Sequence, residues 1–259
     1  MFRNAGMNPV DHPLTSIEVA IVKDAFSKLP VGILSVLEDH LENISFMDSM
    51  PNTALTSPLI PDSGLQRFNI TFRAGILKET ISQWATKKEN TLFNKRNNPG
   101  FEIRVNGGDL NALVYVLLHE ATHVADAVLK ATPHPDSLDE KVLQTNYTKE
   151  AWQMMNKPLP VYIDTLLERT LFRGGAPLDI ELAPEIYMRL RKTPFPSLYG
   201  MASWFEDVAE LETIYHLNKV LRQPFEVMVL RNNKIISKFD PLENHLVNSR
   251  IKYLAMFYQ

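Results

Sequence analysis

Cysteine is absent from all 259 residues of the sequence. This absence excludes disulfide bonds and thiolate metal ligands, so any bound metal ion must be held by imidazole and carboxylate groups. A chain without cysteine also suits an exported bacterial protein, secreted or periplasmic, although it does not exclude a cytoplasmic one.

Long runs of positive charge are also missing, and the formal net charge is -3. We therefore expect no nucleic acid among the partners, because binding a phosphate backbone requires a concentrated basic surface. No apolar run reaches the length needed to span a bilayer, and the first residues, MFRNAGMNPVDHP, lack the apolar core of a signal peptide. These features predict a soluble chain without a transmembrane segment, from which a leader could have been removed before this numbering begins.

Hydrophobic residues make up 45% of the chain, which is enough to bury a large core. We expect one domain over residues 1–259, of the α+β class, with a small mixed sheet packed on one central helix. Residues 1–132 would form an upper lobe that contains the strands. Residues 133–259 would form a mostly helical lower lobe that ends in a hairpin and a helix.

Periodicity and turn residues predict the other elements. Helices are expected at 15–29, 31–41, 78–88, 147–156, 161–172, 183–192 and 241–257. Strands are expected at 67–73 and 101–105, a hairpin at 225–238, and a long loop at 43–64. Arg173-Gly174-Gly175 predicts a glycine cap at the end of the helix that precedes it.

The central helix spans residues 109–130 and reads DLNALVYVLLHEATHVADAVLK, with Asp109 placed to cap its start and Pro133 just beyond its end. Apolar residues surround it on nearly all sides, which is typical of a buried helix. A buried helix carries polar residues such as those of the HEATH pentapeptide only where they find partners. The simplest alternative to a functional site is a core helix whose histidines are hydrogen-bonded.

The HEATH pentapeptide places His119 and His123 four residues apart, so their imidazoles lie on one helix face, close enough to bind one metal ion. Glu120 falls beside that site. Two histidines at this spacing with a glutamate between them are typical of zinc metallopeptidases, in which the glutamate activates a water molecule at the metal. A metal ion would also satisfy the buried imidazoles.

A catalytic zinc usually takes three protein ligands, so a further side chain is required. In metzincins the third ligand lies six residues after the second histidine of the motif. Here that residue is Leu129, which cannot bind a metal ion. Residues 200–221 predict a later helix with Glu206 and Glu210 on one face. We expect Glu206 to bind the metal and Glu210 to accept a hydrogen bond from a ligand histidine. Ser203-x-x-Glu206 is also a capping box, and if Glu206 caps the helix, Glu210 becomes the third ligand.

At these residues the sequence resembles the gluzincin branch of the zincin metallopeptidases, and within it the catalytic domain of anthrax toxin lethal factor and related bacterial proteins. Three features carry the resemblance, which covers residues 110–215: HEATHVAD at 119–126, EDVAE at 206–210, and Tyr199 seven residues before that second motif. The resemblance implies a zincin-like fold and one Zn²⁺ per chain. It also implies that Tyr199 stabilises the oxyanion in peptide-bond hydrolysis.

The site implied in this way has His119, His123 and Glu206 as metal ligands, with Glu120 and Tyr199 as catalytic residues. The substrate would be a protein or peptide. It would lie extended along an edge strand, which could be 101–105 or 67–73.

Asp126, one helical turn after His123, could either support the metal ligands or be a surface residue of the helix. Two other functions are kept beside that of a zinc endopeptidase. One is a catalytically inactive zincin-fold module that binds metal or another protein, and the other is a structural protein with a coincidental motif. A site that had lost catalysis should have lost Glu120 first, and its presence favours the enzyme.

Overall fold

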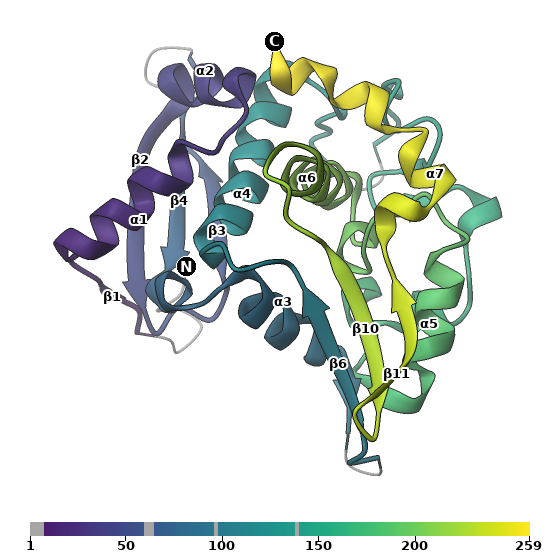
Figure 1. The fold of residues 1–259 in the computed structure, drawn as a ribbon. Helices are drawn as coiled ribbons and strands as arrows, with labels where there is room; N and C mark the ends of the chain where they lie inside the picture. Colours follow the sequence, from purple (N-terminus) through teal and green to yellow (C-terminus); the bar gives the residue numbers. More distant parts are fainter. Residues whose placement is uncertain (1–7, 60–64, 96–97, 138–139) are drawn as a thin grey trace.

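A four-stranded mixed sheet forms much of the amino-terminal part of the molecule (Figure 1). The computed structural model describes residues 8–59, 65–95, 98–137 and 140–259. The strand order is β1-β2-β4-β3, with β2 and β4 parallel and the outer pairs antiparallel. Successive side chains of β4 alternate between the buried core and the other face, as the strand period requires. The strands are β1 (Val10–Asp11), β2 (Leu41–Asp48), β3 (Ala54–Pro58) and β4 (Phe68–Arg73).

The predicted loop at 43–64 is therefore wrong, because β2 and β3 occupy much of it. The connection between the two strands is residues 49–53, where Ser49 adopts a positive φ of 59°, and residues 60–64 of the predicted loop lie outside the described residues. Strand β3 has half-buried residues at four of its five positions. It therefore lacks the polar and apolar alternation by which a strand is found in a sequence.

Four helices accompany this sheet: α1 (Ser16–Phe26), α2 (Val31–His40), α3 (Ile81–Asn90) and α4 (Ala112–Leu129). Helices α1 and α3 begin with capping boxes at Thr15 and Thr80. The start of α4 differs from the prediction, because Asn111 rather than Asp109 is its N-cap and accepts a hydrogen bond of 2.9 Å from the Leu113 backbone N–H. A 3-10 turn, Ala74–Lys78, connects β4 to α3.

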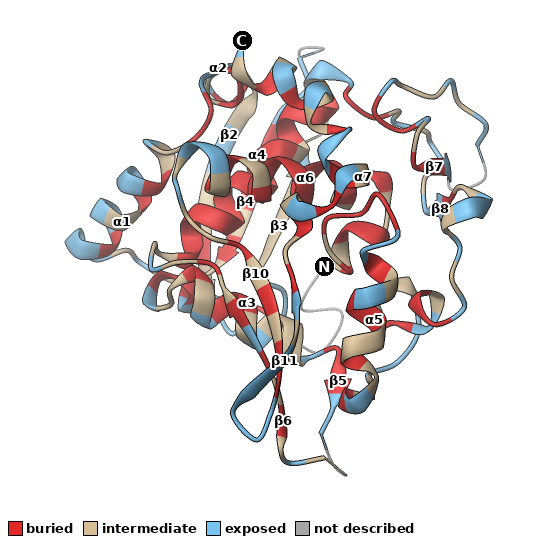
Figure 2. Ribbon diagram, turned by 45° about the vertical axis from the view of Figure 1, so that its right-hand side comes forward, coloured by how far each residue is buried: buried red, intermediate tan, exposed pale blue. Residues whose placement is uncertain are grey.

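Helix α4 is the core helix of the molecule, as Figure 2 shows by the burial of its residues. By length and composition alone its 18 residues could cross a membrane, which differs from the sequence-based expectation. However, 83% of that window is buried inside the protein, as in the central helix of a water-soluble domain. Helices α1, α2, α3 and α6 (Trp204–Tyr215) all pack against it.

The second half of the chain is mostly helical and contains the predicted hairpin, which pairs with β6 in a three-stranded antiparallel sheet ordered β11-β10-β6. Its strands are β6 (Phe101–Asn106), β10 (Glu226–Arg231) and β11 (Lys234–Phe239). Two short pairs are β5 (Phe93–Asn94) with β9 (Leu178–Asp179), and β7 (Trp152–Met154) with β8 (Lys157–Pro158). The α-helices are α5 (Ala183–Leu190), α6 and α7 (His245–Asn248). The other helical segments of this half are the 3-10 helices Pro160–Tyr162, Leu167–Arg169, Leu171–Arg173, Ile180–Leu182, Tyr199–Met201, Pro241–Glu243 and Ile251–Tyr258, and the π-helix His216–Val220.

Two predicted helices in this half are wrong. Residues 147–156 form turns and β7, and residues 161–172 form isolated 3-10 turns. In the second segment the Asp164 side chain accepts hydrogen bonds from the Leu166 and Leu167 backbone N–H groups, and these local bonds compete with a continuous helix. The predicted closing helix is likewise divided, because Asn244 starts a new turn at α7.

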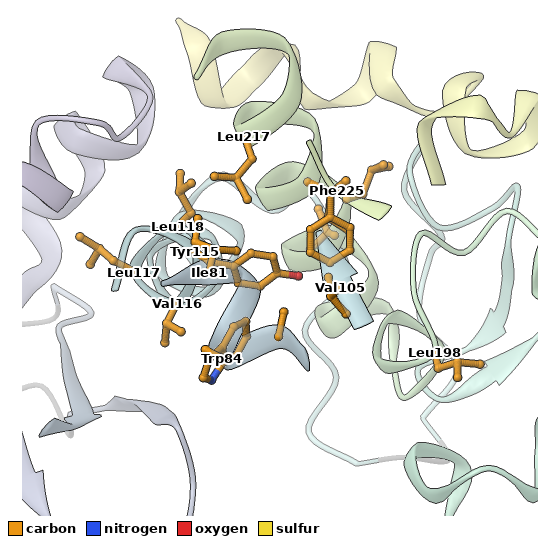
Figure 3. Packing of buried hydrophobic residues seen from close by; sticks show 14 of the residues in the cluster. Ile81, Trp84, Val105, Tyr115, Val116, Leu117, Leu118, Leu198, Leu217 and Phe225 are labelled. Atoms are coloured by element: carbon orange, nitrogen blue, oxygen red, sulfur yellow. The ribbon is translucent and has the colours of Figure 1, made fainter. Parts of the chain in front are cut away.

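These findings confirm the α+β class, with the mixed sheet packed with α4 and a mostly helical C-terminal region. Helices α4 and α6 pack directly against each other. Below this contact, Tyr115 of α4 lies between Trp84 and Phe225, with ring centroids 4.9 and 5.6 Å away (Figure 3). This aromatic packing joins α4 to α3 and to the segment just before β10.

Candidate metal centre

The two histidines of the HEATH pentapeptide face one another on α4. Their Nε2 atoms are 3.2 Å apart, and their rings are perpendicular at 88°. The side chain of His119 is 7% exposed and that of His123 is 19% exposed. Both imidazoles are therefore largely shielded from solvent.

Glu206 approaches this pair from α6. Its Oε2 atom lies 2.9 Å from Nε2 of His119 and 3.5 Å from Nε2 of His123. Ser203 caps α6, because its hydroxyl accepts a hydrogen bond of 3.3 Å from the Glu206 backbone N–H. The Glu206 carboxylate contacts the histidines, so only the serine half of the predicted capping box is present.

The donor atoms of His119, His123 and Glu206 lie within 4.8 Å of one another and could hold a metal ion. Metal–ligand bonds of about 2.1 Å at tetrahedral angles place the ligand atoms about 3.4 Å apart. The closest separations of the three donor atoms are 2.9, 3.2 and 3.5 Å. The spacing of the donor atoms is therefore close to that required around a single small ion.

Glu210 supports this group from one turn further along α6. Its carboxylate is 2% exposed and accepts hydrogen bonds from the Tyr115 hydroxyl at 2.9 Å and the Ser197 hydroxyl at 2.6 Å. Its Oε1 atom lies 3.3 Å from Nδ1 of His119. This contact is electrostatic rather than a directed hydrogen bond, because Nδ1 has no hydrogen-bond partner among the described residues. Glu210 thus contacts a ligand histidine, but the predicted hydrogen bond between them is not formed among the described residues.

The electrostatics of the centre favour a positive charge between the carboxylates. Burial lowers the pKa of His119, but the carboxylates of Glu206 and Glu210 outweigh burial and raise this pKa to about 10. Burial raises the pKa of Glu210, and Lys88 together with the hydrogen-bond donors brings it down to about 2. A proton on the imidazole or a bound metal cation can supply the charge that this arrangement stabilises.

Glu120 lies beside the histidines, and a residue of the four-stranded sheet holds its side chain in place. The Thr56 hydroxyl on β3 lies 2.6 Å from its Oε2 atom and 3.3 Å from its backbone oxygen. A cavity of about 480 Å³ opens at this point, and its lining includes His119, Glu120 and Tyr199. The carboxylate predicted to act as base thus borders a space that a substrate could enter.

Tyr199 also lines this cavity. Its ring stacks on that of His119, with centroids 5.6 Å apart and planes 23° apart, and also contacts Phe172 at 4.8 Å. The residue lies in the 3-10 turn Tyr199–Met201, just before α6. Burial, followed by the charge of Glu206, raises the pKa of Tyr199, so its hydroxyl keeps its proton and can donate a hydrogen bond.

Asp126 lies away from this group. Its carboxylate is buried and accepts hydrogen bonds of 2.6 Å from both the backbone N–H and the hydroxyl of Thr132, and His134 lies 3.3 Å from it. These contacts hold the chain just after α4. Neither sequence-based role describes it, because it is not at the surface and no described contact joins it to the metal ligands.

The strand beside the site is β3, which the sequence analysis did not find. Strand β4, one of the two edges suggested from sequence, lies between β2 and β3 and has no free edge. Strand β6 is an edge strand, but it belongs to the three-stranded sheet. Among the described strands, β3 pairs only with β4, and Thr56 places it against Glu120.

The other residues missed from sequence are Tyr115, Ser197 and Lys88. Tyr115 could have been found, because it lies one helical turn before His119 on the same face of α4. Ser197 and Lys88 carry no local signal, since their relation to Glu210 depends on the packing of distant segments. No family model, no curated protein and no solved structure matches this chain in the three comparisons with known proteins. The geometry of the centre therefore carries the functional inference.

Proposed function

We propose that the protein is a zinc-dependent peptidase that holds one Zn²⁺ per chain through His119, His123 and Glu206. The observation that carries the proposal is the convergence of five groups. The three donor atoms are spaced for one tetrahedral ion, and Glu120 and Tyr199 line the cavity beside them. Two imidazoles and one carboxylate are the ligand set of catalytic zinc sites that leave one position open.

When bound there, zinc would polarise a substrate carbonyl and lower the pKa of a water molecule toward neutrality. Glu120 accepts a proton from the attacking water and returns it to the leaving amine. The Tyr199 hydroxyl, protonated because of its raised pKa, donates a hydrogen bond to the oxyanion. Glu210 holds His119 from the side away from the cavity, through the contact at Nδ1.

The substrate of this proposal is a peptide in extended conformation. It would pair with the free edge of β3, whose residue Thr56 contacts Glu120. Strand addition supplies backbone hydrogen bonds that do not depend on the substrate sequence. A chain bound in this way would pass directly beside the catalytic glutamate.

The experiment compares the zinc-loaded protein with its Glu120→Gln variant on a quenched-fluorescent peptide library. We expect the variant to keep about one zinc per chain and to lose about 100 to 10,000-fold in hydrolysis, because the general base is removed while the ligands stay. Glu102→Gln is the matched control, since it removes a carboxylate from an exposed ion pair with Arg104. Equal hydrolysis by wild type and Glu120→Gln would remove Glu120 from the mechanism.

A second candidate function is a metal-binding module without catalysis. It predicts a wild type that binds zinc and peptides but cleaves none of the library. The buried and hydrogen-bonded Glu120 favours the peptidase, because a binding module has no use for a carboxylate held at that position.

A further inference from the structure

The cavity beside the metal centre has an uneven distribution of charge. Its lining includes three cationic side chains, those of Arg73, Lys87 and Lys88. Among the described residues that line it, Glu120 is the only carboxylate. The cavity therefore presents an excess of positive charge to whatever enters it.

Arg73 is the cation in this cavity that has no partner among the described residues. It is the last residue of β4, and its backbone N–H donates to the Thr53 carbonyl at 2.9 Å, beside the start of β3. Its side chain is half-buried and makes no hydrogen bond or ion pair within the described part of the chain, and its Nε atom is buried without a partner. A guanidinium is always charged, so a half-buried one without a partner is ready to bind an anion.

The two lysines are already engaged. The ammonium of Lys88 lies 3.5 Å from the Glu210 carboxylate and 4.0 Å from the centroid of the Tyr199 ring. The ammonium of Lys87 lies 3.4 Å from Glu79, on a side chain that is 68% exposed. Their charges are offset by carboxylates outside the cavity, which leaves Arg73 as its uncompensated charge.

We propose that this cavity binds an acidic side chain of the substrate, next to the bond that is cleaved, with Arg73 as the specificity-determining residue. The inference rests on the proposed function only in treating the ligand as a substrate. Arginine forms paired hydrogen bonds with a carboxylate, and Trp84 and Tyr115 supply an apolar wall for the methylene groups. Thr53 and Ala54, at the start of β3, line the same cavity, so a peptide paired with β3 passes its entrance.

The test uses capped peptides that share one cleavable sequence and differ at a single position, which carries Glu, Gln or Lys. The position is scanned over the two residues on each side of the cleaved bond. At one of them we expect wild-type kcat/KM to be about tenfold or more higher for Glu than for Gln, and lowest for Lys. Arg73→Gln should abolish the difference between Glu and Gln, and Arg73→Glu should favour Lys.

Arg67→Gln is the matched control, because it removes the same charge just before β4, where the side chain is exposed and paired with Glu42. It should keep the wild-type preference. Zinc content and the thermal unfolding midpoint of each variant verify that the fold is intact. A preference for Glu that survives in Arg73→Gln, or no preference for Glu at any scanned position, would overturn the proposal.

A separate binding measurement distinguishes this inference from the proposed function. Fluorescence anisotropy of the labelled peptides is measured with zinc-loaded Glu120→Gln protein, so that binding is observed without cleavage. Tighter binding of the Glu peptide, lost on adding Arg73→Gln, supports a pocket for an acidic side chain even if no peptide is cleaved by the wild type. Equal binding of the Glu, Gln and Lys peptides contradicts the pocket even if cleavage is efficient.

Discussion

At the scale of single residues, Glu206 and Glu210 lie one turn apart on α6 but have different surroundings. Glu206 faces both Nε2 atoms of the histidine pair, whereas Glu210 accepts hydrogen bonds from two hydroxyl groups behind His119. The sequence alone leaves the choice between them open, because Ser203-x-x-Glu206 fits a capping box as well as a ligand. Only the packing of α6 on α4 separates the two roles.

The two glutamates should therefore differ in their effect on zinc affinity. Glu210→Gln should weaken binding by about 10 to 100-fold, as changes behind a ligand do. Glu206→Gln should weaken it far more, because a ligand with a full charge is lost. Competition with a chromophoric zinc chelator measures both dissociation constants. A larger loss in Glu210→Gln would make Glu210 the third ligand.

Tyr199 allows a test of transition-state stabilisation without a change in packing. Tyr199→Phe keeps the ring stacked on His119 and removes only the hydroxyl. We expect normal zinc content, a similar KM and a loss of about 100 to 1,000-fold in kcat, because the donor acts when the oxyanion forms. Steady-state kinetics on one cleaved peptide give both constants. A change confined to KM would assign Tyr199 to the wall of the substrate pocket instead.

At the scale of elements, α6 is held by a buried ion pair next to its metal ligand. Asp207 follows Glu206 and accepts hydrogen bonds from Arg250 at 3.0 Å and from the Trp152 indole at 2.7 Å. Arg250 also donates to the Pro194 carbonyl at 2.9 Å. Both charged side chains are fully buried, with exposures of 1% or less. This pair joins α6 to the C-terminal segment.

Arg250→Met should lower the free energy of unfolding by about 3 to 5 kcal/mol, because it leaves the Asp207 carboxylate buried without its partner. Chemical denaturation of the metal-free protein measures the change. Arg104→Gln serves as control and should cost much less, since its ion pair with Glu102 is exposed to solvent. Equal effects of the two substitutions would contradict the anchoring role of the buried pair.

The elements differ in how far they can be predicted from the sequence. Strong local sequence patterns predict helix α4, strands β4 and β6, and the hairpin of β10 and β11. Strand β3 has none, because its place is set by pairing with β4, which follows it in the chain. The segments at 147–156 and 161–172 have helical composition, but contacts to α6 and local side-chain bonds prevent helices there.

At the scale of the whole molecule, Glu212 of α6 joins two distant segments. The Tyr258 hydroxyl near the C-terminus lies 2.7 Å from its Oε1 atom and 2.9 Å from Nδ1 of His216. Nε2 of His216 lies 2.8 Å from the Lys28 carbonyl and must carry the proton there. With His216 neutral, a protonated Glu212 can donate a hydrogen bond to the Tyr258 hydroxyl, which in turn donates to Nδ1 of His216. Each hydrogen bond in this series then has one hydrogen atom.

This arrangement predicts a pH dependence of stability. Burial raises the pKa of Glu212 to about 8. Because the folded-state pKa lies above the ordinary value of 4.5, the contribution of Glu212 is complete below about pH 4.5 and is lost as pH rises to about 8. Glu212→Gln should therefore make the fall in unfolding free energy between pH 5 and 8 shallower. Identical pH profiles for the variant and the wild type would contradict the raised pKa.

The central claim is that His119, His123 and Glu206 together bind one metal ion, and zinc titration of chelator-stripped protein tests it most directly. Isothermal titration calorimetry should give a stoichiometry of one zinc per chain for the wild type and for His245→Ala, whose histidine is exposed and outside the centre. His123→Ala should lose this binding, because two ligands remain where three are needed. A wild type that takes up no zinc, or a His123→Ala variant that binds it as tightly as the wild type, would contradict the account.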